Sequence, residues 1–241
     1  MRPPVYAYPV SEFLLSEFLE SDESPARDLP IFYNHYLSPP QTNTMYIHYN
    51  IEQLTRFSER NAMLRLWGSG KISEIWDYSI ENCKILNELN IPCKHVPFTL
   101  TEKRLEYYKT LIHVKKEYDI GFCGTLSLRR QKIFDDLRDI GMNVLVLTNV
   151  NNEERDKLLA KCKMIINIHF ADDYKIFERS RCEQWLRVGV PVISEESLDN
   201  DSRAICVPYD KLVETCKGWK ITFCGCNTCA PDSSSLYRIV C

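Results

Sequence analysis

Short apolar runs alternate with longer helix-forming segments along most of this chain, and few folds accommodate such a pattern. In the first half, the runs 45–49, 72–76 and 93–96 predict strands, and helices are expected over 50–67 and 79–89. Strands that are joined through a helix run parallel in one sheet. The pattern therefore predicts a parallel sheet with helices packed against it.

The alternation begins again after a charged, helix-forming stretch at 99–117, which we interpret as a connection between two domains. The prediction is an α/β chain with one domain at 1–98 and a more complete, doubly wound domain at 118–241. Ligands of such sheets bind at the carboxyl ends of the strands, so a ligand is expected in a cleft between the domains. The second domain is expected to hold strands at 119–123, 143–148, 164–169, 190–194 and 205–207, with helices at 128–140, from 151 onward and at 176–188.

The charge balance argues against a nucleic-acid partner. The chain carries 30 Lys and Arg against 33 Asp and Glu, so no general positive field attracts a polyanion or an anionic membrane. No apolar run reaches the length of a membrane span. The N-terminus lacks an apolar core followed by a cleavage site, so a cytoplasmic protein is expected.

Eleven cysteines are present, a large number for a chain of 241 residues. Without an export signal, they are expected to be reduced and mostly buried thiols. Three of them, Cys224, Cys226 and Cys229, cluster near the C-terminus. A zinc-stapled interaction module centred on this cluster stays open as an alternative, although the usual paired Cys-x2-Cys spacing is missing. The prediction is a Cys-rich tail without a bound metal.

The first candidate binding motif follows the strand expected at 119–123. Gly124 and Thr125 lie just before a predicted helix that begins with Arg129 and Arg130 in its first turn. Glycine lets the backbone approach an anion closely, and the start of a helix offers free N–H groups to phosphate. The motif predicts a diphosphate site, while the alternative is an ordinary tight turn with a solvated basic face. The spacing is not Gly-x-Gly-x-x-Gly, which argues against a dinucleotide site.

The helix expected at 176–188 carries the second candidate motif. Cys182 and Trp185 share the face that should pack on the sheet, and Glu178 and Arg181 continue the same stripe toward the start of the helix. A buried carboxylate and a buried guanidinium are costly without partners, so they either pair with each other or face a polar ligand. The opposite face, which is expected to be solvated, carries Arg179, Glu183 and Arg187.

The segment from Phe177 to Glu195 resembles the C-terminal motif of GT-B glycosyltransferases, in which an acidic residue precedes a helix that ends in Gly-x-Pro-Val-Ile. Here Glu178 is the acidic residue, and residues 189–193 read Gly-Val-Pro-Val-Ile. The similarity extends to residues 119–130 and 163–170. Over about residues 45–207 the chain resembles small glycosyltransferases encoded by large DNA viruses of algae and amoebae, which are chlorovirus-like.

This resemblance implies two Rossmann-like domains that face a cleft, the N-terminal one reduced. It implies transfer of a sugar from a nucleotide-sugar to a glycan hydroxyl in the host cytoplasm, with UDP as the expected nucleotide and xylose as the sugar suggested by algal viruses. Glu178 would hold sugar or ribose hydroxyls, and His169 would touch the nucleotide-sugar. No metal cofactor is expected, because an Asp-x-Asp motif is absent. Retaining enzymes of this fold often carry a second glutamate where this chain has Leu186, so inversion is predicted.

An inverting transferase needs a base that removes the proton of the acceptor hydroxyl. His48 lies near the carboxyl end of a predicted strand and Asp77 follows another, so both are predicted as base candidates. Their structural alternatives are a buried strand histidine and a helix cap. Other nucleotide-binding proteins on a Rossmann scaffold, including sugar-nucleotide-modifying and redox enzymes, stay open because a fold alone does not fix the chemistry.

Overall fold

The computed structural model describes residues 31–33, 45–150 and 152–223, which form two compact units. The N-terminal unit contains the described residues up to Arg104, and two later segments, 172–180 and 197–200, also belong to it. The C-terminal unit contains the remaining described residues. The domain limits expected at 98 and 118 assume continuous stretches of chain, whereas both units here are discontinuous. The predicted Cys-rich cluster at 224–229 lies outside the described residues.

The N-terminal unit is built on a parallel four-stranded sheet with the order β1-β2-β3-β4. The register pairs Asn50 with Asp77 and Asp77 with His95, which places the carboxyl ends of three strands at one edge of the sheet. Polar side chains from these ends are therefore close together. The strands are β1 (Ile31–Tyr33), β2 (Tyr46–Asn50), β3 (Ile72–Asp77) and β4 (Cys93–His95).

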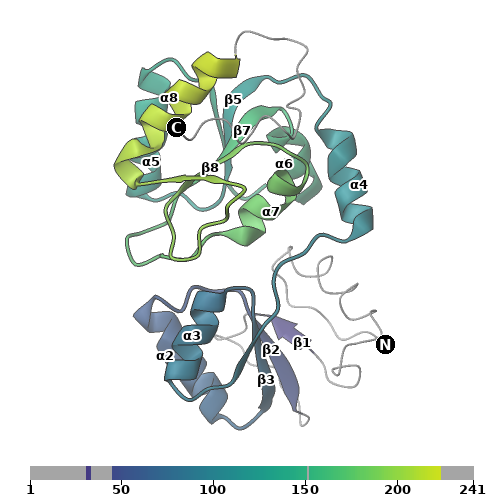
Figure 1. Cartoon of the computed structure of the whole chain (residues 1–241), viewed down its shortest axis with the longest axis vertical. Helices are drawn as coiled ribbons and strands as arrows, with labels where there is room; N and C mark the ends of the chain where they lie inside the picture. The colour runs from purple at the N-terminus through teal and green to yellow at the C-terminus, as the bar shows by residue number, and fades with distance from the viewer. Residues whose placement is uncertain (1–30, 34–44, 151, 224–241) are drawn as a thin grey trace. The chain divides into compact units, whose positions relative to one another are not determined.

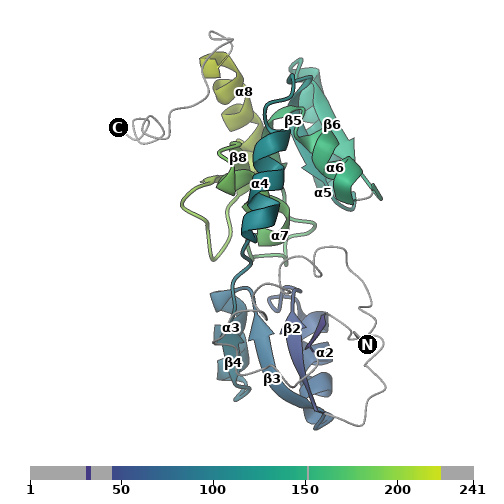
Figure 2. The same cartoon turned by 90° about the vertical axis from the view of Figure 1, so that its right-hand side faces the viewer.

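Two helices, α2 (Phe57–Gly68) and α3 (Ile80–Glu88), connect these strands. Figures 1 and 2 show both helices on the same side of β2 and β3. The first helix begins seven residues later than the expected start at Asn50, because Asn50 ends β2 and its amide donates to the Glu52 carbonyl in a turn. The core between the helices and the sheet consists of Tyr46, Leu54, Met63, Leu66, Ile72, Ile75, Leu86 and Ile91.

The other face of this sheet has a core of its own. Because side chains alternate along a strand, Ile47 and Tyr49 point away from the helices. They pack with Trp76 and with Phe98, and Ile176 from the segment 172–180 completes the cluster. This segment, which follows the third strand of the other unit in the sequence, is thus part of the core of the N-terminal unit.

The C-terminal unit has a parallel five-stranded sheet with the order β6-β5-β7-β8-β9. From β5 the chain first continues to β6 on one side, and then crosses to β7, β8 and β9 on the other side. The direction of winding therefore changes between β5 and β7. This is a doubly wound, Rossmann-like arrangement, in which the switch point between two central strands is the usual ligand site. The strands are β5 (Tyr118–Cys123), β6 (Val144–Leu147), β7 (Cys162–Asn167), β8 (Val192–Glu195) and β9 (Ile205–Val207).

Helices cover both faces of this sheet, with α5 and α8 on one side and α6 and α7 on the other (Figure 1). The first side encloses an apolar core in which the rings of Phe122 and Phe134 pack in a tilted arrangement, with their centroids 5.0 Å apart. None of the described helices is long and apolar enough to cross a bilayer. The helices are α4 (Glu102–Leu111), α5 (Leu128–Asp139), α6 (Asn152–Leu159), α7 (Arg179–Arg187), the 3-10 helix η1 (Tyr209–Lys211) and α8 (Leu212–Phe223).

The predicted α/β character and the parallel sheets are confirmed. Each strand and helix that was expected within the described residues is found, with ends that shift by up to three residues, except for the start of α2, which shifts by seven. Sequence patterns did not predict β1, η1 and α8. Helix α8 packs on α5 through Leu212 and Cys216, so its place depends on a partner surface that local sequence does not reveal.

Candidate functional site

An arginine from α7 occupies the switch point of the C-terminal sheet. The Nε of Arg181 donates to the carbonyl of Cys123 at the end of β5 (2.9 Å), and Nη1 donates to Oδ1 of Asn167 at the end of β7 (2.5 Å). Its guanidinium lies 5.0 Å from the centroid of the Phe122 ring. Within the described part of the chain, Nη2 has no hydrogen-bond partner. Arg181 is thus held by both central strands, while one nitrogen keeps its donors for a ligand.

Gly124 follows β5 directly and lies beside this nitrogen. Its φ of 151° is a backbone conformation that side chains rarely adopt. A Cβ at this position would lie 3.1 Å from Nη2 of Arg181 and 3.2 Å from the Phe122 ring. Glycine therefore permits both the turn and the close approach of the guanidinium. The following Thr125 is exposed, so the start of the loop is accessible from solvent.

Arg129, in the first turn of α5, makes a bidentate ion pair with Glu195 at the end of β8. Its guanidinium lies 3.8 Å from the centroid of the Tyr209 ring, and the hydroxyl of Tyr209 donates to the Arg129 carbonyl. The carboxylate of Glu195 also accepts the backbone N–H of His169 (3.0 Å). Arg129 is therefore neutralised by the protein itself, so the prediction that it balances a diphosphate requires displacement of Glu195.

Arg130 and His169 contact backbone carbonyl groups in the loops around this site. Arg130 is only 3% exposed and donates to the carbonyls of Ile168 (2.9 Å) and Thr125 (2.6 Å). The His169 side chain is buried, and its Nε2 lies 3.1 Å from the Glu196 carbonyl. Both side chains connect the ends of different strands. Their observed contacts are those of residues that position the site, rather than of groups open to a ligand.

Six of the predicted binding residues therefore gather at the carboxyl ends of β5, β7 and β8. Sequence reasoning missed Asn167 and Glu195, which hold Arg181 and Arg129. The signal that would have found them is their position as polar residues at the ends of apolar strands. The gathered residues are Gly124, Thr125, Arg129, Arg130, His169 and Arg181.

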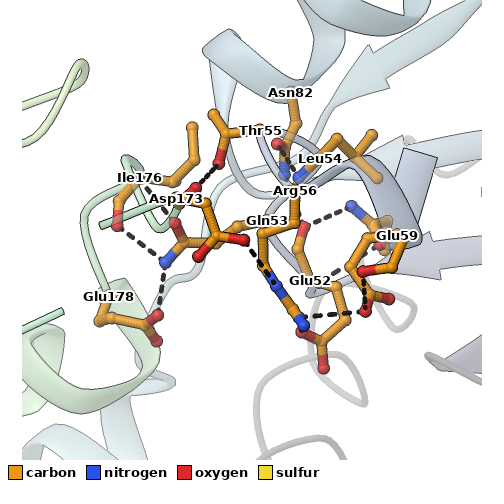
Figure 3. Close-up of polar contacts among 12 residues, drawn as sticks. Glu52, Gln53, Leu54, Thr55, Arg56, Glu59, Asn82, Asp173, Ile176 and Glu178 are labelled. Carbon is orange, nitrogen blue, oxygen red and sulfur yellow. Dashed lines mark hydrogen bonds and ion pairs between the residues drawn. The ribbon is translucent and has the colours of Figure 1, made fainter. Parts of the chain in front are cut away.

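Glu178 belongs to the N-terminal unit and has a different partner. The side-chain amide of Gln53 donates to Oε1 of Glu178 (2.5 Å) and to the carbonyl of Ile176 (3.0 Å), and its oxygen accepts the backbone N–H of Ile176 (2.8 Å). Figure 3 shows these three bonds converging on one glutamine. The predicted alternatives for Glu178 were a pair with Arg181 or a ligand, whereas the contact described here is with Gln53.

Two residues that follow Gln53 in the sequence, Thr55 and Arg56, also contact the segment 172–180. The hydroxyl of Thr55 donates to the Asp173 carbonyl (2.8 Å), and the guanidinium of Arg56 lies 4.5 Å from the centroid of the Tyr174 ring (Figure 3 shows the Thr55 bond). Arg56 also forms an ion pair with Glu59 at 3.0 Å. Gln53, Thr55 and Arg56 thus bind the segment 172–180 through polar side chains.

Asp77, a predicted base, is completely buried at the end of β3. Its carboxylate accepts hydrogen bonds from the side chains of Asn50 (2.5 Å) and Asn82 (3.1 Å) and from the backbone N–H of Ser79 (2.8 Å). Burial raises the pKa of Asp77 to about 8, although these hydrogen bonds lower it. The contacts describe a residue that joins two strand ends to the start of α3, so its burial does not support a role as the base.

His48, the other predicted base, lies in the middle of β2 on the helix-covered face and has no exposed surface. An acceptor hydroxyl must come within hydrogen-bond reach of a base. The position of His48 matches the structural alternative, a buried strand histidine.

One expectation for α7 is wrong. Glu183 is buried, at 7% exposure, instead of lying on a solvated face. Its carboxylate accepts hydrogen bonds from both Nη atoms of Arg203, and Arg203 also pairs with Asp201. The spacing of Arg179, Glu183 and Arg187 suggested pairs within the helix, but the stronger partner comes from a loop 20 residues away. Cys182 and Trp185 are buried as predicted.

Comparison with known proteins gives relatives without an assigned activity. No family model matches the chain. It is 37% identical over 175 residues to uncharacterized protein L138 of Acanthamoeba polyphaga mimivirus, covering 72% of this chain and 18% of that protein. It is also 37% identical over 150 residues to uncharacterized protein L140 of that virus, covering 58% of this chain and 49% of the relative.

A third mimivirus protein, uncharacterized protein L137, is 36% identical over 177 residues, which cover 73% of this chain and 22% of that protein. The chain thus spans between about a fifth and a half of the length of these curated relatives. The expected similarity to proteins of a large DNA virus is confirmed.

Proposed function

We propose that this chain is a glycosyltransferase that moves a sugar from a nucleotide-sugar to a hydroxyl group of a glycan. The donor would bind to the C-terminal unit at the carboxyl ends of β5 and β7. This is the place where doubly wound sheets bind nucleotides. The resemblance of residues 177–195 to the GT-B motif supports the choice of sugar transfer among the reactions that such sheets catalyse.

The observation that carries the proposal is the anchoring of Arg181. Sugar transfer leaves a nucleoside diphosphate on which negative charge grows, and preorganised cationic donors stabilise that charge. Two strand ends fix the guanidinium of Arg181, and its Nη2 lies beside Gly124, where a Cβ would come within 3.1 Å of it. The start of α7 adds the positive end of a helix dipole nearby. Such a group supplies a diphosphate site without rearrangement of the protein.

The remaining residues of the site act through this arginine or through the loops around it. Arg130 fixes the loop after β5, and Glu195 holds both Arg129 and the backbone of His169. Arg129 would bind a phosphate only after it leaves Glu195. UDP is the proposed nucleotide, with xylose as the first sugar to test. The proposal requires no metal cofactor and assigns an inverting reaction.

Nucleotide binding by Arg181→Ala tests this proposal directly. Hydrogen bonds to charged groups contribute about 1.5–3 kcal/mol, so the affinity for UDP should fall roughly 10- to 100-fold. The affinity for UMP, which lacks the second phosphate, should change less. Arg187→Ala is the matched control, because Arg187 is exposed in the last turn of the same helix. Calorimetric titration of each variant with UDP, UMP and NAD provides the measurement.

Unchanged affinity for UDP in Arg181→Ala would contradict the assigned role, and binding of NAD alone would favour a redox enzyme on the same fold. Gly124→Ala provides an independent variant, since its added methyl group would meet Nη2 of Arg181 at 3.1 Å. This substitution should weaken UDP binding while every charge of the site is preserved. Release of UDP from UDP-xylose in the presence of a glycan acceptor then tests the transfer itself.

A further inference from the structure

Two cysteines of the N-terminal unit lie in direct contact. The Sγ atoms of Cys83 on α3 and Cys93 on β4 are 2.8 Å apart. A disulfide bond is about 2.05 Å long, so an approach of about 0.8 Å would bring the sulfurs to bonding distance. We propose that Cys83 and Cys93 form a reversible disulfide, a modification site that reacts with low-molecular-weight disulfides.

Both cysteines belong to regular secondary structure, Cys83 to α3 and Cys93 to β4, so the backbone fixes the positions of the two sulfurs. The N–H of Cys83 bonds to the carbonyl of Ser79 inside the first turn of α3. Cys93 is the first residue of β4 and pairs with Ile75 of β3. A tight turn joins α3 to this strand, with Asn90 at a φ of 58°. The pair therefore links a helix to the strand that follows it.

The two thiols differ in their access to solvent, which gives the reaction an order. Cys83 is 7% exposed, whereas Cys93 is half-buried on β4, at the end of the strand order. An external reagent therefore reaches Cys93 first. Cys83 lies behind it at contact distance and is placed to complete the reaction.

The chemistry is an ordinary exchange. The thiolate of Cys93 attacks one sulfur of an external disulfide, forms a mixed disulfide and releases one thiolate. The thiolate of Cys83 then attacks the Cys93 sulfur and releases the second thiolate. The protein loses two thiol protons and two electrons, and the external disulfide is reduced to two thiols. An excess of a small thiol reverses both steps.

The surroundings of the pair also set the pH dependence of this exchange. The hydrogen bond with Cys83 raises the pKa of Cys93 well above its ordinary value, and burial raises it further. The thiolate is the attacking species, so the exchange should be slow near pH 7 and accelerate toward pH 9. The bond would connect the ends of residues 83–93 and reduce the entropy of the unfolded chain, so the oxidised unit should unfold at a higher temperature.

Peptide mapping of the full chain tests the proposal, because Lys84 separates the two cysteines for trypsin. The protein is incubated with glutathione disulfide at pH 8.5, its free thiols are blocked with iodoacetamide, and it is digested without reductant. The expected product is peptide 72–84 joined to peptide 85–94, each of which contains one cysteine. Its mass should be that of the two peptides less two hydrogen atoms, and it should vanish after reduction.

Cys93→Ser should remove the joined peptide and leave Cys83 largely unreactive, while Cys206→Ser should still give it. Cys206 is the matched control because it is also half-buried, on β9 of the other unit. The proposal would be overturned if both peptides of the wild-type protein carried only iodoacetamide or glutathione, or if Cys83 and Cys93 joined other cysteines instead. The wild-type map alone decides between these outcomes, so the test does not depend on the folding of a variant.

Discussion

At the scale of single residues, Asp77 shows how burial outweighs hydrogen bonding. Three donors point at its carboxylate, yet the loss of solvation raises its pKa from 3.8 to about 8. The nearby Asp199, whose own pKa burial also raises, adds repulsion. At neutral pH the folded protein therefore holds a proton on Asp77 that the unfolded chain releases.

The raised pKa of Asp77 predicts a stability that falls as pH rises. Below about pH 4 the carboxyl is protonated in both states, and between pH 4 and 8 only the folded state keeps the proton. The free energy of unfolding should then decrease with a slope of up to about 1.4 kcal/mol per pH unit. Asp77→Asn, which cannot ionise, should flatten this slope. Urea unfolding at several pH values between 4.5 and 8.5 measures it.

Asp135→Asn is the control for this comparison, because Asp135 is exposed on the surface of α5. It is the same Asp-to-Asn substitution at a position that is not buried, so the slope of the wild-type protein should persist. Equal slopes for Asp77→Asn and the wild-type protein would show that the carboxyl does not titrate in this range.

At the scale of elements, a serine cap begins one helix in each unit. Ser79 accepts the backbone N–H of Asn82 at the start of α3, and Ser127 accepts that of Arg130 at the start of α5. The two caps differ in their surroundings. Ser79 is buried and its hydroxyl also donates to the carboxylate of Asp199 (3.1 Å). Ser127 is half-buried.

This difference predicts unequal effects of the same substitution. Ser127→Ala should cost about 1 kcal/mol of stability, the usual effect of losing an N-cap. Ser79→Ala should cost more, by about 1–3 kcal/mol, because it also removes the hydroxyl that donates to the half-buried Asp199 carboxylate, which then keeps the bond from the Phe177 N–H. Chemical unfolding of both variants measures the difference. Equal losses would show that the bond to Asp199 adds no stability.

At the scale of the whole molecule, each compact unit consists of segments that are not consecutive in the sequence. Residues 172–180 follow β7 of the C-terminal unit but pack in the N-terminal unit. Gln53 bonds both backbone groups of Ile176, and Asp199 accepts the N–H of Phe177 at 2.7 Å. Side-chain amides and carboxylates thus replace the strand partners that this irregular backbone lacks, as buried backbone groups require.

Loss of the Gln53 bonds should therefore loosen this segment. Gln53→Ala leaves the N–H and the carbonyl of Ile176 without these partners, which should cost about 1–3 kcal/mol for each buried group. The segment contains Lys175 and Arg179, so limited trypsin digestion should cleave the variant there faster than the wild-type protein. Gln131→Ala is the control, because Gln131 makes only an exposed bond to Asp135 in α5. Equal rates of cleavage would contradict the docking role of Gln53.

Much of the fold follows from the sequence because its cause is local. The alternation of apolar runs and helix-forming segments predicts parallel strands separated by helices, and Ser79 correctly marks the start of α3. The glycine after β5 was also evident, as were Glu178 and Arg181 on the stripe of Cys182 and Trp185. In parallel sheets the strand ends share one edge, so residues at these ends could be expected to gather there.

Only the tertiary structure decided which partners these residues meet. Asn50 and Asp77 pair because two strands take a particular register, and Gln53 binds Ile176 across 123 positions of sequence. Arg129 meets Glu195, and Glu183 is buried against Arg203, although each pattern favoured a solvated or ligand-facing side chain. Hydrophobic periodicity reports which face of an element is covered, whereas ion pairs and buried hydrogen bonds depend on the packing of distant elements. For this reason the sequence locates the candidate site, while the tertiary structure determines that Arg129 pairs with Glu195 there and that Arg181 is held by Cys123 and Asn167.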